Sequence, residues 1–268
     1  MKINSCNVNP SKIFLRSSDK GVSYNGFRRK KVGSWNKAEN WMGIPTCMEC
    51  GGFFGIDKEF HSFGIAIHRL TIEMCEWRGK RVPIDNDKIC VSEYRVIVTE
   101  GNIPYFAFKQ CGYELLKNGD YVSEISDGKW VIFGGEIEEI TGGVQYFRGE
   151  FLAGNVIISD GVQRFWGKSS AGNARIAGGE QHFYDKSSAG NAKITGGNQY
   201  LYNESLAGKA EIAGGNQYFC NKSSADNAKI SGGLQCFNER SSVGKAKITG
   251  GHQHYHNISS TKNPRTKQ

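Results

Sequence analysis

Residues 176–193 read IAGGEQHFYDKSSAGNAK, and residues 194–211 read ITGGNQYLYNESLAGKAE. The two stretches are successive copies of one unit of 18 residues, and further copies lie on both sides of them. The isoleucine that opens the unit recurs seven times, at Ile140, Ile158, Ile176, Ile194, Ile212, Ile230 and Ile248. A glutamine follows five positions later (Gln145 to Gln253), and a large apolar residue two positions after that (Phe147 to Tyr255). A strict internal period predicts a repeat architecture.

The repeated unit has the pattern of short strands joined by tight bends. The segments 192–194 and 199–201 alternate between residues suited to a core and polar residues, which is the period of a β-strand. Glycine pairs such as Gly196-Gly197 separate the strands and supply positive φ angles. A unit of this length is too short for two packed helices, and its glycine pair would break them. We therefore predict a mainly β protein with a single-chain β-solenoid of about seven turns over residues 135–260.

The first half of the chain carries no such repeat. Residues 63–72 and 88–98 are strand-like, residues 105–117 are typical of a short helix, and Asp127-Gly128 favours a hairpin turn. We expect residues 1–134 to form an N-terminal α+β domain that caps the solenoid, and residues 261–268 to form a basic flexible tail.

Composition restricts the class of protein. The chain has 268 residues, with 34 Lys+Arg against 26 Asp+Glu and a net charge of +8. Glycine is abundant (35) and proline scarce (5), without the triplet period of collagen. No apolar run approaches the roughly 18 residues of a membrane helix, and residues 1–20 lack the pattern of a secretory signal. Eight cysteines are too sparse for a disulfide scaffold. We expect a soluble cytoplasmic protein with reduced thiols and no membrane partner.

Two resemblances accompany these patterns. The Gly-Asn-Ala and Gly-Gly-x-Gln units over about residues 140–260 resemble the degenerate repeats of bacterial autotransporter passenger domains, which implies a β-solenoid. Residues Gly26-Phe27, Trp41 and 50–55, with the strand 88–98, resemble an uncharacterised domain that precedes repeat arrays in phage and bacterial proteins. That family implies no chemistry for the N-terminal half.

The alternation assigns each repeat an inner and an outer set of side chains. The glutamines share the inner face with the core ring, so we expect their amides to hydrogen-bond from turn to turn. The residues beside them should form one solvent-side binding face: Tyr146, Arg148, Arg164, Trp166, His182, Tyr184, Tyr200, Tyr202 and Tyr218. Such a face is typical of an interface with a protein, a second copy, the N-terminal domain, sugar rings or bases. A purely structural ladder of aromatic pairs is the alternative.

A second outward column is basic. Arg175, Lys193, Lys229 and Lys247 recur once per turn and are interrupted by Glu211. A basic row at this spacing suits the phosphates of nucleic acid, and it equally suits a solvated face that discourages edge association.

Two groups of histidines and cysteines have ligands that zinc prefers. One is His252, His254, His256 and Cys236 in the last turn, and the other is the pair Cys47 and Cys50. The nearest additional ligands for the pair are Cys75, Cys90, His61 and His68. Ordinary buried thiols and a polar terminal coil are the alternatives. The cofactor that these residues suggest is zinc, and the histidines with Cys236 also suit copper.

The sequence contains no phosphate-binding loop and no hydrolase motif. We interpret the protein as a non-enzymatic binding or scaffold protein that engages a protein partner, or a second copy through its face or its C-terminal end. One alternative is a protein, phage-encoded in view of the resemblance, that sequesters or senses a nucleotide or glycan. Another is an enzyme in the N-terminal domain that uses Cys50, His61, His68 or Glu73.

Overall fold

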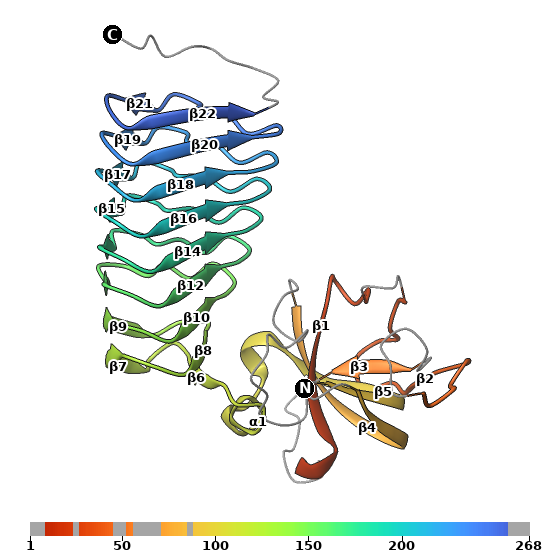
Figure 1. Ribbon diagram of the computed structural model, residues 1–268. Helices are drawn as coiled ribbons and strands as arrows, with labels where there is room; N and C mark the ends of the chain where they lie inside the picture. The colour runs from red at the N-terminus through yellow and green to blue at the C-terminus, as the bar shows by residue number, and fades with distance from the viewer. Residues whose placement is uncertain (1–8, 24–26, 45–51, 56–70, 85–87, 257–268) are drawn as a thin grey trace. The chain divides into compact units, whose positions relative to one another are not determined.

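The computed structural model describes residues 9–23, 27–44, 52–55, 71–84 and 88–256 (Figure 1). The chain divides into two compact units, residues 1–114 and residues 115–268. No helix among the described residues has the length and apolar character needed to cross a bilayer.

The N-terminal unit is built on an antiparallel sheet. Its elements are the 3-10 helix η2 (Pro10–Lys12), β1 (Ile13–Ser18), β2 (Asn36–Lys37), β3 (Phe53–Gly55), β4 (Thr71–Ile84), β5 (Lys88–Thr99), the 3-10 helix η5 (Glu100–Asn102) and α1 (Tyr105–Gln110). The strand order is β1-β4-β5-β2, and β3 also pairs with β5. Phe14, Phe53 and Tyr94 pack their rings together in its core, with the ring centres of Phe53 and Tyr94 4.6 Å apart.

Local predictions for this half are confirmed in part. The predicted strand 88–98 corresponds to β5, whereas residues 63–70 of the other strand lie outside the described residues. The predicted helix 105–117 is wrong in extent, because α1 ends at Gln110 and residues 114–116 form a strand. The predicted hairpin at Asp127-Gly128 is also wrong. The strands on either side of this turn belong to different sheets, so it is a corner of a coil.

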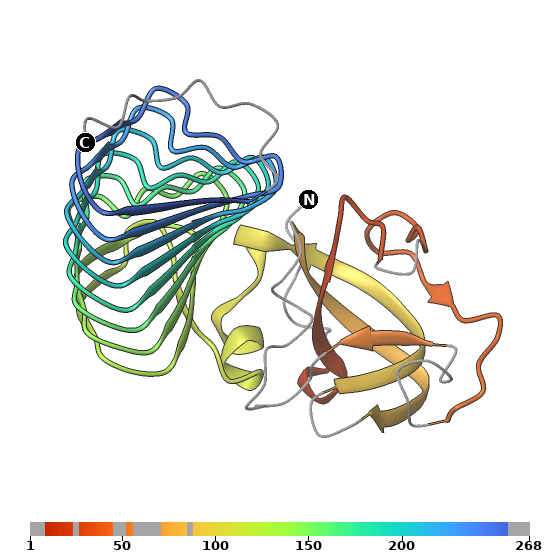
Figure 2. The ribbon, with the colours of Figure 1, turned by 45° about the horizontal axis from the view of Figure 1, so that its top comes forward.

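The second unit is a β-solenoid, as the repeat predicts. Each coil gives one strand to each of two parallel sheets, and the coils lie one upon the next (Figures 1 and 2). The long-strand sheet contains nine strands: β6 (Glu114–Leu116), β8 (Lys129–Ile132), β10 (Val144–Phe147), β12 (Val162–Phe165), β14 (Glu180–Phe183), β16 (Asn198–Leu201), β18 (Asn216–Phe219), β20 (Leu234–Asn238) and β22 (His252–His256). The short-strand sheet contains eight: β7 (Tyr121–Ile125), β9 (Glu136–Ile140), β11 (Ile157–Ile158), β13 (Arg175–Ile176), β15 (Lys193–Ile194), β17 (Glu211–Ile212), β19 (Lys229–Ile230) and β21 (Lys247–Ile248). The stacking therefore begins before the repeat becomes visible in the sequence.

Equivalent residues of successive units lie directly over each other. Ile176 pairs with Ile194, and Gln181 pairs with Gln199. Inside the coil the isoleucine, phenylalanine and alanine columns form one continuous buried core. The rings of Phe165 and Phe183 stack with centres 4.7 Å apart. The core is thus a set of columns, each made of one residue type with few exceptions.

The buried glutamines form the hydrogen-bonded ladder expected from the sequence. Each Nε2 donates to the Oε1 of the glutamine one coil earlier at 2.9 Å, from Gln163 to Gln253. The same Nε2 also donates to a backbone carbonyl three residues before it, as Gln199 does to Gly196 at 3.1 Å. The amides within the column, from Gln163 to Gln235, thereby bond to each other and to the backbone without water.

Three corners of the coil have a left-handed backbone, and two of them show how this restricts the sequence. Gly197 has φ +78°, and a Cβ there would lie 2.6 Å from the carbonyl oxygen of Gly179 one coil earlier. A second corner is left-handed in six successive coils of the described chain and is glycine only in the first two of them. Its residues are Gly149, Gly167, Asp185, Asn203, Asn221 and Glu239. Asparagine and aspartate tolerate this conformation better than other side chains, which explains the composition of the corner.

The ladder makes Gln199→Leu a sensitive test of the stacking. The substitution leaves Gln181 Oε1 and the Gly196 carbonyl without their donor, and Gln217 Nε2 without one acceptor. An unsatisfied buried group costs about 1–3 kcal/mol, so we expect the free energy of unfolding to fall by about 2 kcal/mol or more. Urea denaturation followed by circular dichroism measures it. The matched variant Gln253→Leu, in the half-exposed last rung, should lose less than half as much; equal losses would contradict the ladder.

Candidate binding face of the solenoid

The outer side chains of the long-strand sheet form two parallel columns, which we call the aromatic face. The first column contains Tyr146, Arg164, His182, Tyr200, Tyr218, Cys236 and His254. The second column follows the core ring and contains Arg148, Trp166, Tyr184, Tyr202, Cys220, Asn238 and His256. In the parallel register, each residue of a column lies beside the equivalent residue of the next coil.

The rings within each column stack face to face. In the second column, Tyr184 lies between Trp166 and Tyr202, with ring centres 4.0 Å and 5.1 Å away. In the first column, Tyr200 lies between His182 and Tyr218, at 4.7 Å and 5.0 Å. The planes differ by only 9–13°. Both faces of the two central tyrosine rings are therefore covered by protein, and their edges point outward.

Most of the sequence-predicted face residues are half-buried: Arg164, Trp166, His182, Tyr184, Tyr200, Tyr202 and Tyr218. The expectation that all nine residues face solvent is wrong for two of them. Tyr146 is 0% exposed and Arg148 is 2% exposed. The Arg164 guanidinium covers the Tyr146 ring at 5.6 Å, and its Nη1 donates to the Tyr146 hydroxyl at 3.3 Å. The alternation of residues along a strand predicts the side on which a side chain lies, but it does not predict how exposed that side chain is.

Burial changes the protonation of this face. It raises the pKa of Tyr202 to about 12, and it raises the pKa of Tyr146 to about 12. It lowers the pKa of His182, although a hydrogen bond to Glu180 partly offsets the effect. The imidazole Nε2 lies 3.4 Å from the Glu180 carboxylate. At neutral pH the face therefore presents protonated phenols and a neutral imidazole.

The structure does not assemble the metal site expected in the last coil. Among the described residues, no three His, Cys, Asp or Glu side chains lie together as a metal site requires. Cys236 does stack against His254 in the register of the sheet, while His252, His254 and His256 follow one another along β22. Alternate side chains of one extended strand are about 6.7 Å apart and run parallel, so they do not converge. Cys47, Cys50, His61 and His68 lie outside the described residues.

The cysteines depart from the expectation of reduced thiols at one position. Cys90, in β5, is disulfide-bonded. Cys75, Cys111, Cys220 and Cys236 are not in disulfides. Burial raises the pKa of the Cys75 thiol, so this group is poorly suited to act as a nucleophile.

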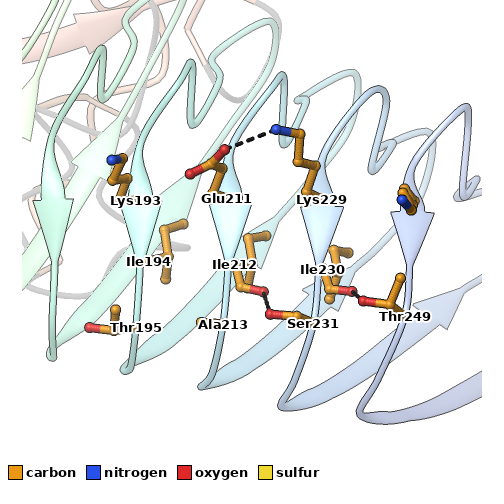
Figure 3. A pocket seen from close by; sticks show the side chains of 11 residues that line it. Lys193, Ile194, Thr195, Glu211, Ile212, Ala213, Lys229, Ile230, Ser231 and Thr249 are labelled. Carbon is orange, nitrogen blue, oxygen red and sulfur yellow. Dashed lines mark hydrogen bonds and ion pairs between the residues drawn. The ribbon is translucent and has the colours of Figure 1, made fainter.

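The basic row forms as expected on the short-strand sheet. Figure 3 shows Lys193, Glu211 and Lys229 in one column, beside a shallow groove of about 430 Å³. Lys229 Nζ lies 3.0 Å from the Glu211 carboxylate. The hydroxyls on the other wall donate to carbonyls one coil earlier, as Thr249 does to Ile230 at 3.5 Å. The groove is thus partly neutralised, and these hydroxyls already have partners.

Glu73 is the one residue of the proposed N-terminal enzyme site that the structure describes. It is fully buried, with Arg29 Nε 2.5 Å and Arg16 Nε 3.4 Å from its carboxylate. The Ser18 hydroxyl also donates to it at 2.8 Å. The sequence gives no sign of this cluster, because its members come from separate segments. Because Arg16 and Arg29 both form ion pairs with the Glu73 carboxylate, this group has a structural role.

Comparison with known proteins adds no relative to this picture. No family model matches the chain, and searches of the curated proteins and of the solved structures give no match either. Neither resemblance noted in the sequence is supported or opposed by these comparisons.

The protonation of His182 provides a test of the packed face. We expect its pKa to lie below the ordinary value of 6.5, because burial disfavours the imidazolium. In Glu180→Gln the pKa should fall further, since the carboxylate that stabilises the charge is gone. The unfolded state then binds the proton first, so acidification through pH 6.5 should destabilise the solenoid. NMR titration of the imidazole measures the pKa, and a value above 6.5 would contradict the burial of this ring.

Proposed function

We propose that this is a non-enzymatic binding protein whose solenoid holds the aromatic face rigid for a protein partner. The observation that supports it is the pair of stacked columns around Tyr184 and Tyr200. Tyrosine, tryptophan and arginine are enriched in the centres of protein interfaces, where they supply large contact areas at low entropic cost. Because each ring is packed between rings of the neighbouring coils, the stack is ordered before a partner binds, and binding costs little side-chain entropy.

The ring orientation favours a protein over the other ligands that the sequence suggests. A sugar or a base would need a free ring face, and both faces of Tyr184 and Tyr200 are occupied. Ring edges with hydroxyl groups instead suit the mixed polar and apolar surface of a protein. Nucleic acid at the basic row is less favoured, because Glu211 pairs with Lys229 within it.

The C-terminal end of the solenoid is the proposed surface for a second copy. In the core column Phe237 is 0% exposed, whereas Tyr255 in the last coil is 42% exposed. The Gln253 side chain donates a hydrogen bond to Gln235 Oε1. No described residue donates a hydrogen bond to Gln253 Oε1. The coil that contains β22 therefore still has an exposed core ring and an unused amide acceptor, and a second copy could stack on both.

In this proposal the protein acts as a scaffold in the cytoplasm, where Cys220 and Cys236 at the face would stay reduced. The Cys90 disulfide is the feature that opposes this compartment. Mass spectrometry of the intact chain, alkylated without prior reduction, distinguishes the two states.

Photo-crosslinking tests the proposal. We would place p-benzoylphenylalanine at Tyr202 on the face, at Tyr255 on the end, and at exposed Lys209 as the control, in bacterial cells expressing the chain. We expect a discrete adduct from position 202 that is absent from position 209. Adding Tyr200→Ser should abolish it and Tyr200→Phe should retain it, because only the phenyl ring is needed for the stack.

The mass of each adduct identifies the partner. Twice the chain mass from position 255 supports the second copy at the end, and any other discrete mass from position 202 supports a different protein at the face. Twice the chain mass from position 202 would assign the face to self-association. The absence of a discrete adduct at position 202 would overturn the proposed role of the aromatic face.

A further inference from the structure

The N-terminal unit contains a basic cleft that no pattern in the sequence indicates. It has a volume of about 560 Å³ and is lined by Phe27, Arg28, Lys30, Asn36, Lys37, Ala38 and Glu39. Such a volume lies within the range of small-molecule sites. All of its residues come from one segment, whose two arms are held together across the cleft.

The described residues that line the cleft carry more positive than negative charge. Arg28, Lys30 and Lys37 are exposed, and none of them forms an ion pair within the described part of the chain. Glu39 is the single acidic residue of the lining, which leaves a net charge of +2 (three cations minus one anion). In the sequence, no acidic residue occurs between Asp19 and Glu39. Three cations around one small cavity favour an anion with several charges.

Hydrogen bonds and an ion pair hold the backbone that carries the three cations. Arg29 turns inward to the buried Glu73, so its neighbours Arg28 and Lys30 turn outward. Asn36 is buried; its Oδ1 accepts from the Lys30 backbone N–H at 2.8 Å, and its Nδ2 donates to the Tyr94 carbonyl at 3.3 Å. On the other arm, Ala38 N–H donates to the Ser92 carbonyl at 2.8 Å. The arm that carries Lys30 is thereby tied to the arm that carries Lys37.

An aromatic ring completes the cleft. Phe27 is half-buried and packs against Phe53 with ring centres 4.9 Å apart, while it also lines the cavity. An anchored ring beside unpaired cations matches a ligand that combines a planar group with phosphates. The basic row of the solenoid differs in this respect, because its lining has no aromatic residue and Glu211 neutralises one of its lysines.

We propose that this cleft binds a free nucleotide, with its phosphates at Arg28, Lys30 and Lys37 and its base against Phe27. Lysine and arginine form charge-assisted hydrogen bonds with phosphate oxygens, and a di- or triphosphate supplies enough charge to match the lining. This site is independent of the aromatic face and would add a small-molecule ligand to a protein that engages a partner through its solenoid.

Isothermal titration of the full chain tests the cleft, with ATP, adenosine and an oligothymidylate as probes in buffer containing a chelator. We expect ATP to bind and adenosine to bind at least about tenfold more weakly, since it lacks the phosphates. In Lys30→Ala/Lys37→Ala the ATP affinity should fall by about tenfold or more. The matched variant Lys209→Ala/Lys245→Ala, which removes two exposed lysines from the solenoid, should bind ATP like the parent chain.

Several outcomes would overturn the assignment. These are no heat of binding at millimolar ATP, equal affinity for adenosine and ATP, or equal losses in the two double variants. Tighter binding of the oligothymidylate than of ATP, lost in Lys30→Ala/Lys37→Ala, would assign the cleft to a nucleic-acid strand instead. Circular dichroism and thermal melting of both variants confirm that each remains folded.

Discussion

Hydrogen bonding between parallel coils is the constraint on which the solenoid depends. Backbone groups of each coil bond to the coil before it, as Thr195 N–H does to the Ile176 carbonyl at 2.9 Å. The glutamine amides repeat the same connection inside the core. A single coil has no partner for either set of groups, so its stability comes from its neighbours. Stacking in register then forces each repeat position into a column, and a buried column must be apolar or able to bond to itself.

The same constraint explains how much of the fold could be predicted from the sequence. The isoleucine, glutamine and phenylalanine columns can be predicted from the period alone. The inner face of each coil must carry side chains that are apolar or that hydrogen-bond to the same residue in the next coil. The strands β6, β7 and β8 precede the predicted start of the solenoid, because their residues do not follow the repeat although they stack in the same two sheets. In the N-terminal unit, the apolar pattern of β5 predicts a strand, which the structure contains. The predicted helix is longer than α1, because residues 114–116 form a strand that pairs with β8 of the solenoid.

The candidate sites divide in a similar way. Alternation placed the aromatic columns on one side of their sheet, yet it did not indicate that Tyr146 and Arg148 are buried, because burial depends on what lies above a strand. The His-x-His-x-His pattern of β22 suggested metal ligands, but residues on one straight strand do not converge. The Glu73 cluster and the basic cleft rest on contacts between separate segments, such as Asn36 with Tyr94, and a pattern along the chain does not record them.

Methyl NMR tests the stacking most directly. With the isoleucine δ1 methyl groups selectively labelled, the register pairs Ile194 with Ile212 and Ile212 with Ile230, in strands about 4.8 Å apart. The account predicts nuclear Overhauser contacts along this series, each between residues 18 positions apart in the sequence. A folded protein that lacks these contacts, or that shows isoleucine contacts at another spacing, would contradict it.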